Sequence, residues 1–184
     1  MRTLSRVVKR GVPMIGALAS LLCASVIASD PAEAAEAAIG DALCPLGSQV
    51  VTFSPGITNT PAVSTITYNV NLGTCVSLTT PSLTSGTSSG SASLTFQCSD
   101  LLSTSTGSQD ITWNTGQTST FSYTRTFSLV NGNSVTSLNG SITSGLFNGD
   151  TASLVITDRN LDLLACQSPG GLTHIDGTTV FYAG

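Results

Sequence analysis

Charged residues are scarce in this 184-residue chain, at 9% of the total against about 25% in an average globular protein. After Ala37 the chain has no lysine and no glutamate, and two arginines against seven aspartates give a net charge of −5. A nucleic-acid-binding surface needs cations to replace phosphate counterions, and attraction to anionic lipid needs them too. The composition therefore argues against nucleic acid as a partner, and against a membrane surface once the signal described below is removed.

Recognisable catalytic motifs are also lacking. The single histidine, His174 in GLTHIDG, has Asp176 close by. One stretch, GTSSG at 86–90, has the G-x-S-x-G spacing of a nucleophile motif, but it lies in a low-complexity Ser/Thr/Gly-rich segment, where such a match carries little weight. Because the chain has no glutamate after Ala37, the carboxylate pair of a glycosidase would have to come from aspartates. No pair of aspartates has a sequence spacing that indicates such a site. We interpret His174 as a surface or turn residue. We predict a protein that is not an enzyme, with no catalytic residue and no cofactor; a secreted hydrolase using His174 is the least favoured alternative.

The N-terminus has the pattern of a secretory signal peptide. Four of the six cations lie in the first ten residues, an uncharged run covers 11–29, and two A-x-A sites follow. We predict that residues 1–37 are a signal, cleaved near 34–37, and that 38–184 form one domain. The uncharged run is barely the length of about 20 residues that a membrane span needs, and Pro13 interrupts it. The sequence therefore predicts a secreted, extracellular protein.

Cleavage would leave four of the five cysteines. An even number of cysteines in an exported protein indicates disulfides, and the wide spacings do not fit compact zinc-ligand patterns. We predict two disulfides, and the sequence does not choose among the three pairings that four cysteines allow. The half-cystines are Cys44, Cys75, Cys98 and Cys166.

After the signal, apolar and polar residues alternate with the period of half-buried strands. The alternation is clear in 64–72, 91–98, 119–130 and 150–158. Three Asn-Gly pairs, Asn131-Gly132, Asn139-Gly140 and Asn148-Gly149, are typical of tight hairpin turns. We interpret the Ser/Thr/Gly-rich stretch 79–90 as a surface loop or a flexible sheet edge. Together these patterns predict an all-β fold, an antiparallel β-sandwich of the immunoglobulin-like or a similar type, with a barrel as the other architecture that such spacing suggests.

Two charged features stand out. Arg125 shares the apolar face of its strand with Tyr123 and Phe127, so we predict that it points inward toward Asp110, Asp150 or Asp158. The alternative is that it lines a binding surface.

The run Asp158–Asp162 has the D-x-N-x-D start of a calcium loop. Leu163 and Pro169 stand at its sixth and twelfth positions and exclude an EF-hand. We interpret the run as a polar turn and assign no metal ligand, while an irregular calcium site remains the open alternative.

The other face of strand 119–130 is a row of hydroxyl side chains without a charge. We interpret it as a solvated face or, functionally, as a neutral docking surface for a secreted protein or a cell-surface glycan. An unprotected sheet edge is a second way to recruit a partner strand. Trp113, Tyr68, Tyr123 and Tyr182 are candidate sugar-stacking residues, although single aromatics usually belong to a core. The candidate binding surface is Thr120, Ser122, Thr124, Thr126, Ser128 and Trp113.

Several segments resemble small exported proteins of Streptomyces-type actinobacteria: VTFSPGITNTP, GTCVS, ITWNTGQTSTFSYT, GSITSGLFNGDT and LLACQSPGGLT. The resemblance covers most of the chain after the signal and implies export and a β-fold, but no activity. We expect a non-enzymatic interaction protein, such as an adaptor subunit of an extracellular assembly or toxin particle. A carbohydrate-binding module is the main alternative.

Overall fold

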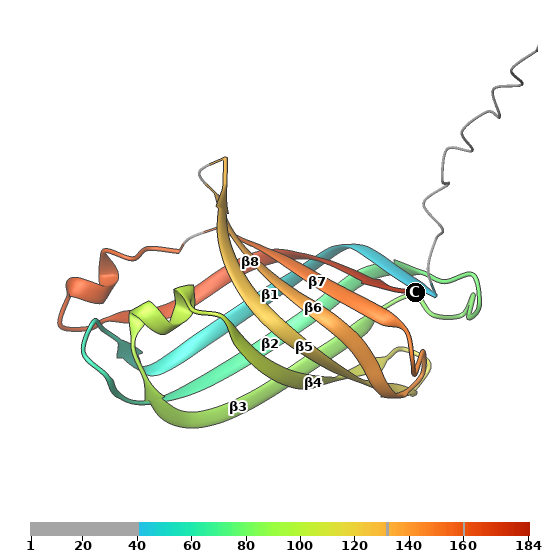
Figure 1. Cartoon of the computed structure of the whole chain (residues 1–184), viewed down its shortest axis with the longest axis horizontal. Helices are drawn as coiled ribbons and strands as arrows, with labels where there is room; N and C mark the ends of the chain where they lie inside the picture. Colours follow the sequence, from blue (N-terminus) through green and yellow to red (C-terminus); the bar gives the residue numbers. More distant parts are fainter. Residues whose placement is uncertain (1–40, 132, 160) are drawn as a thin grey trace, which may run out of the picture. The chain divides into compact units, whose positions relative to one another are not determined.

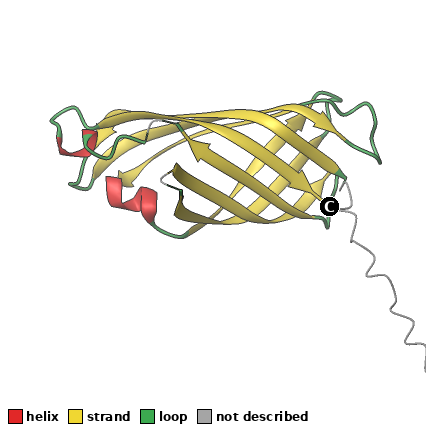
Figure 2. Ribbon diagram, turned by 90° about the horizontal axis from the view of Figure 1, so that it is seen from above, coloured by secondary structure: helices red, strands yellow, loops and turns green. Residues whose placement is uncertain are grey.

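The computed structural model describes residues 41–184 except 132 and 160, so the predicted signal, 1–37, lies outside the described residues. The described part forms eight antiparallel strands and two short 3₁₀ helices, η1 (Cys98–Leu102) and η2 (Ala165–Gln167) (Figures 1 and 2). The strands are β1 (Ala42–Ile57), β2 (Ala62–Val76), β3 (Gly86–Phe96), β4 (Ser105–Trp113), β5 (Thr118–Val130), β6 (Asn133–Gly145), β7 (Thr151–Asp158) and β8 (Leu172–Ala183).

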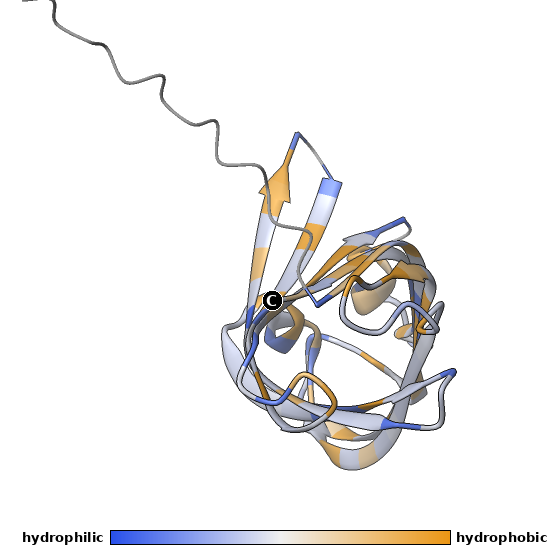
Figure 3. Ribbon diagram, turned by 90° about the vertical axis from the view of Figure 1, so that its right-hand side faces the viewer, coloured by the Kyte–Doolittle hydropathy of each residue, from blue (hydrophilic) through white to orange (hydrophobic). Residues whose placement is uncertain are grey.

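The predicted sandwich is wrong, because the sheet closes into a barrel. Each strand pairs with the next along the chain, and β1 pairs with β8 from Ala42↔Ala183 to Ile57↔Leu172. Viewed end on, the strands form a ring, beyond which the β5–β6 hairpin projects (Figure 3). Alternation buries one face of each strand, and either a facing sheet or a barrel interior satisfies that requirement. The pattern within strands therefore could not separate the two architectures.

Most of the predicted strand faces are confirmed. Phe121, Tyr123, Arg125 and Phe127 lie on the inner face of β5, as predicted, and the hydroxyl row lies on its outer face. Ala152, Leu154 and Ile156 of β7 are buried inside the barrel. Of the stretch 79–90, predicted as a surface loop or a flexible edge, residues 79–85 precede β3 and Gly86 begins it, so a loop over the whole stretch is wrong.

Two of the predicted hairpin turns are confirmed and one is wrong. Asn131 has a φ of 52° and follows β5, where Val130 pairs with Asn133 of β6, and Asn148-Gly149 lies between β6 and β7. Asn139-Gly140 instead continues β6. A Cβ on Gly140 would meet the carbonyl oxygen of Ser122 in β5 at 1.9 Å, so this glycine allows a close approach of two backbones. Glycine is suited both to tight turns and to close approaches between backbones, and only the pairing of the strands shows which of the two applies.

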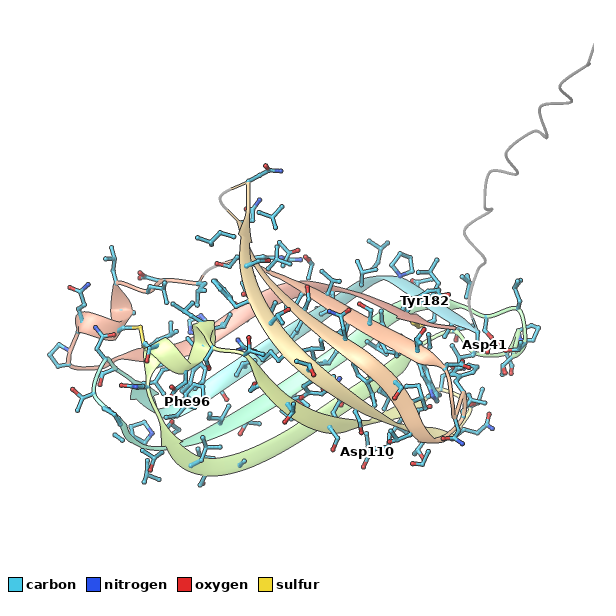
Figure 4. The ribbon with its side chains drawn as sticks, in the orientation of Figure 1. Asp41, Phe96, Asp110 and Tyr182 are labelled. Carbon is cyan, nitrogen blue, oxygen red and sulfur yellow. A yellow bond between two sulfur atoms is a disulfide. The ribbon has the colours of Figure 1, made fainter. Side chains whose placement is uncertain are left out.

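The interior divides into two parts along the barrel. The "packed half" is centred on Trp113, Phe121 and Phe181, whose side chains are at most 2% exposed. The "cavity half" has a second cluster that includes Phe53, Leu172 and Ile175, and contains η1 and η2. Phe96 lines the cavity half, and Figure 4 shows it near η1, at the end of the barrel opposite Asp41 and Tyr182.

The two predicted disulfides are confirmed, one in each half. Cys44–Cys75 joins β1 to β2 in the packed half, and Cys98–Cys166 joins η1 to η2 in the cavity half. Such bonds are typical of proteins that fold in oxidising compartments, which is compatible with an extracellular protein. Within the described residues, no helix has the length and apolar character to cross a membrane.

Candidate ligand cavity

The cavity half encloses a space of about 300 Å³. Its floor is formed by Tyr68, Tyr123, Leu138 and Ile156, which also contact the packed core. Most of its wall is apolar. The apolar side chains come from every strand except β4, which contributes polar residues, and from η1 and the segment between β7 and η2. The apolar lining residues are Val51, Phe53, Ile66, Phe96, Leu101, Phe127, Leu138, Ile156, Leu161 and Ile175.

A break in the barrel wall borders this cavity. Among the described residues β3 and β4 are joined by two residue pairs, Gly86↔Trp113 and Thr87↔Thr112. Residues 88–96 of β3 and 105–111 of β4 therefore face each other without a ladder, and we call this the β3–β4 seam. Ala92 and Leu94 share the inner face of β3 with Phe96, but both are exposed, Leu94 at 40%. The interior is thus accessible to solvent along the seam.

Arg125 enters the cavity from β5, as the alternation predicted. Its Nη1 donates to the carbonyl oxygen of Ser103 at 3.0 Å, and its Nη2 donates to that of Leu101 at 2.5 Å. The guanidinium therefore holds the η1–β4 connection against the cavity rim. Of the three predicted acidic partners, Asp158 acts on Arg125 electrostatically. Asp110 lies on the outer face and accepts a hydrogen bond from Thr120, and Asp150, between β6 and β7, interacts with Asp41 instead. Burial lowers the pKa of Arg125, and the negative charge of Asp158 opposes that shift.

Asp158 lines the same cavity from the end of β7. Burial raises its pKa to about 6, and the positive charge of Arg125 limits the rise. The calcium-like run that begins at Asp158 does not converge: Asp158 faces the cavity, while Oδ1 of Asp162 accepts the backbone N–H of Leu164. In the described part of the chain, no three His, Cys, Asp or Glu side chains form a metal-binding group.

Gln109 is a cavity residue that the sequence analysis missed. It lies on the inner face of β4 with Ile111 and Trp113, is 7% exposed, and its Nε2 has no hydrogen-bond partner among the described residues. A buried amide without a partner costs free energy, so such groups call for an explanation. The sequence pattern that could have indicated it is the alternation of Gln109 with Ile111 and Trp113, which places the glutamine on the apolar face of the strand. This pattern is easily overlooked in a chain rich in polar side chains.

The residues of the candidate binding surface do not all lie on one exposed face. Thr124, Thr126 and Ser128 are exposed on the outer face. Thr120 and Ser122 are only partly exposed there, and each is hydrogen-bonded to a neighbouring hydroxyl. Trp113 is not part of this surface: it is 2% exposed, and its Nε1 donates to Oγ of Ser119 at 2.8 Å inside the packed half. Two of the three tyrosines, Tyr68 and Tyr123, line the cavity, so the described aromatics do not form an exposed sugar-stacking row.

His174 lies on the outer face of β8, outside the cavity lining. Its Nε2 is 3.9 Å from Oδ2 of Asp176, and its side chain is 57% exposed. Its Nδ1 is 3.5 Å from the hydroxyl of Thr173. This pair is therefore a surface contact on one strand, separated by the barrel wall from the buried polar groups.

The fold and cavity define a class of architecture, an up-and-down eight-stranded barrel with space inside for one small molecule. We found no family model, no curated protein and no solved structure that matches the chain. The functional argument therefore depends on the cavity itself.

Proposed function

We propose that this protein is an exported binding protein that holds one small, mainly apolar molecule inside the cavity half of its barrel. The observation that carries the proposal is the cavity of about 300 Å³, bordered by aromatic side chains and by Gln109, whose Nε2 has no partner among the described residues. This volume is at the lower end of the range found for small-molecule sites, which are typically apolar with a few convergent polar groups.

The contrast between the two halves supports this interpretation. An eight-stranded barrel is just wide enough for side chains to fill it or for one small ligand to occupy it. In the packed half, large aromatic residues meet across the axis, with ring centroids of Trp113 and Phe181 5.9 Å apart. In the cavity half, the inward side chains leave a space although the same strands continue through it. Protein interiors normally leave few voids larger than a water molecule, so a space of this size is consistent with an occupant.

Titration of the purified chain with N-phenyl-1-naphthylamine, a neutral fluorophore that brightens in apolar surroundings, tests the proposal. We expect saturable one-to-one binding. Ile66→Trp fills the cavity from β2 and should weaken binding by about tenfold or more, or abolish it. Thr67→Trp is the matched control, because the same bulk is placed on the outer face of that strand, and it should bind like the wild type. No saturable binding, or equal affinity in the two variants, would contradict the proposal.

A second candidate function, docking of a protein partner, is favoured by one observation, the open edge of β3. Residues 88–96 carry no charge, proline or lysine, the usual devices that keep a sheet edge from pairing. A partner strand added at the seam would support the adaptor role expected from the sequence. Native mass spectrometry of the chain isolated from its own source tests this. A stoichiometric protein partner that is lost in Ser91→Pro would support docking, and a monomer alone would count against it.

A further inference from the structure

Hydrogen-bond donors gather on the inner side of the β3–β4 seam, at the floor of the cavity. Gln109 contributes its Nε2, which is buried and has no partner in the described part of the chain. Tyr68 and Tyr123 are half-buried, line the same cavity, and interact electrostatically with each other. The cavity thus has a polar corner in an otherwise mostly apolar lining.

Two glycines direct the tyrosines toward this corner. Tyr68 of β2 lies over Gly90 of β3, where an added Cβ would be 2.8 Å from the tyrosine Oη. Tyr123 of β5 lies over Gly107 of β4, where a Cβ would be 2.9 Å from its Oη. The phenol groups therefore approach the seam from its two sides. Gln109 is two residues beyond Gly107 on the same face of β4, so all three polar groups border one part of the cavity.

The charges in the cavity favour a neutral ligand. Asp100 and Asp158 line the cavity with one cation, Arg125, whose guanidinium already donates to two backbone carbonyls. A carboxylate ligand would therefore meet more negative than positive charge. A neutral carbonyl oxygen accepts hydrogen bonds from an amide N–H and from phenol O–H groups without bringing a charge into a low-dielectric space.

We propose that the ligand is a neutral apolar molecule with one carbonyl group, whose oxygen accepts a hydrogen bond from Nε2 of Gln109 beside the hydroxyls of Tyr68 and Tyr123. Its apolar body lies against Phe53 and Phe96, whose rings stack with centroids 6.3 Å apart. This inference rests on the proposed function, since it specifies which molecule the cavity holds. Binding then satisfies the buried amide that the free protein leaves without a partner.

The test is displacement of N-phenyl-1-naphthylamine by two molecules of nearly equal shape. The compound 2-acetylnaphthalene has a C=O group where 2-isopropenylnaphthalene has C=CH₂, so the pair isolates the hydrogen bond. We expect the ketone to bind about tenfold to a hundredfold more tightly, because the alkene leaves Gln109 without a partner. The advantage should disappear in Gln109→Met and persist in Gln117→Met, the same substitution at an exposed glutamine between β4 and β5. The anion 2-naphthoate should bind more weakly than the ketone at pH 7.5.

The possible results separate this inference from the proposed function. If the fluorophore binds but the ketone and the alkene are equal, the carbonyl inference is overturned and the cavity function stands. If 2-naphthoate binds more tightly than the ketone, the assignment of a neutral ligand is overturned. If the fluorophore does not bind, both proposals fail. Should Gln109→Met not fold, as judged by circular dichroism, Tyr123→Phe removes only a hydroxyl, and we expect it to reduce the preference for the ketone.

Discussion

The packed half and the cavity half are built from the same strands, yet their inward positions are occupied differently. On β5, Phe121 is fully buried against Phe181, with ring centroids 6.0 Å apart, whereas Arg125 and Phe127 line the cavity six or fewer residues away. In the packed half, hydrogen bonds that run from Trp113 through Ser119 to the carbonyl of Leu146 satisfy two buried side chains, although Oγ of Ser88, opposite Val70, has no partner among the described residues. In the cavity half, Nε2 of Gln109 has no partner in the same part of the chain. The packed half therefore supplies the close-packed aromatic core, and the cavity half supplies the space for the proposed binding.

The largest expected effect comes from a matched pair of phenylalanines on β5. Phe121→Ala should lower the free energy of unfolding by about 4 kcal/mol, because it removes a fully buried ring and leaves a void in a close-packed core. Phe127→Ala should cost about 1 kcal/mol, since that ring is half-buried and already borders empty space. Urea unfolding measures both. Equal losses would show that the two halves are packed to the same degree.

Each half contains one disulfide, so the two halves can also be compared by removing each bond in turn. In the chain-entropy description, removing Cys98–Cys166, with a separation of 68 residues, should cost about 4 kcal/mol, and removing Cys44–Cys75, with 31, slightly less. Removal of the two disulfides should affect ligand binding differently. The Cys98→Ala/Cys166→Ala double variant releases η1 from η2 at the cavity, so we expect weaker binding of N-phenyl-1-naphthylamine. The Cys44→Ala/Cys75→Ala variant should bind normally where it is folded; weakened binding in both variants would argue against separate roles for the halves.

The sequence predicts those features of both halves that depend on neighbouring residues or on composition. Alternation identified the inner face of β5, including Arg125, and cysteine number predicted two disulfides, because both depend on local or compositional features. Closure of the sheet depends on the pairing of β1 with β8, which are more than a hundred residues apart and carry no pairing code that can be read from one chain. The cavity was missed for the same reason: it is defined by the side chains that fail to meet across the barrel. Gln109 and the glycines beneath Tyr68 and Tyr123 lie together only once the barrel has closed, so the sequence alone does not show that they share a site.

Ser119 tests how much the packed half depends on its hydrogen bonds. Ser119→Ala should cost about 2 kcal/mol, because it leaves the buried Nε1 of Trp113 without an acceptor and the carbonyl of Leu146 without a donor. Ser122→Ala is the control on the same strand. Its hydroxyl is 3.3 Å from that of Thr143 on the outer face, where water can replace it, so the expected loss is below about 0.5 kcal/mol. Thermal or urea unfolding separates the two, and a similar cost at both positions would refute this account.

The smallest expected effect is a dependence on pH that comes from Asp158 in the cavity half. Burial and the neighbouring Asp41 also raise the pKa of Asp150, between β6 and β7, so substitution of Asp158 is needed to isolate its share. Burial raises the pKa of Asp158 to about 6 from an ordinary value near 3.9. Between these values the folded protein holds the proton more tightly than the unfolded chain. The stability that protonated Asp158 contributes is therefore present below about pH 4 and lost as the pH rises to about 6.

Asp158→Asn removes this titration. Because Asp158 is only half-buried, solvent screening reduces the effect, and we expect the variant to be more stable than the wild type by about 1 kcal/mol at pH 7. The two proteins should converge near pH 4, where the wild-type carboxyl is also neutral. Asp110→Asn, at an exposed position on the outer face, should change stability by less than about 0.5 kcal/mol at either pH. Urea unfolding at both pH values decides the matter: a wild type that is the more stable protein at pH 7 would mean that the attraction of Asp158 to Arg125 outweighs the cost of burying its charge.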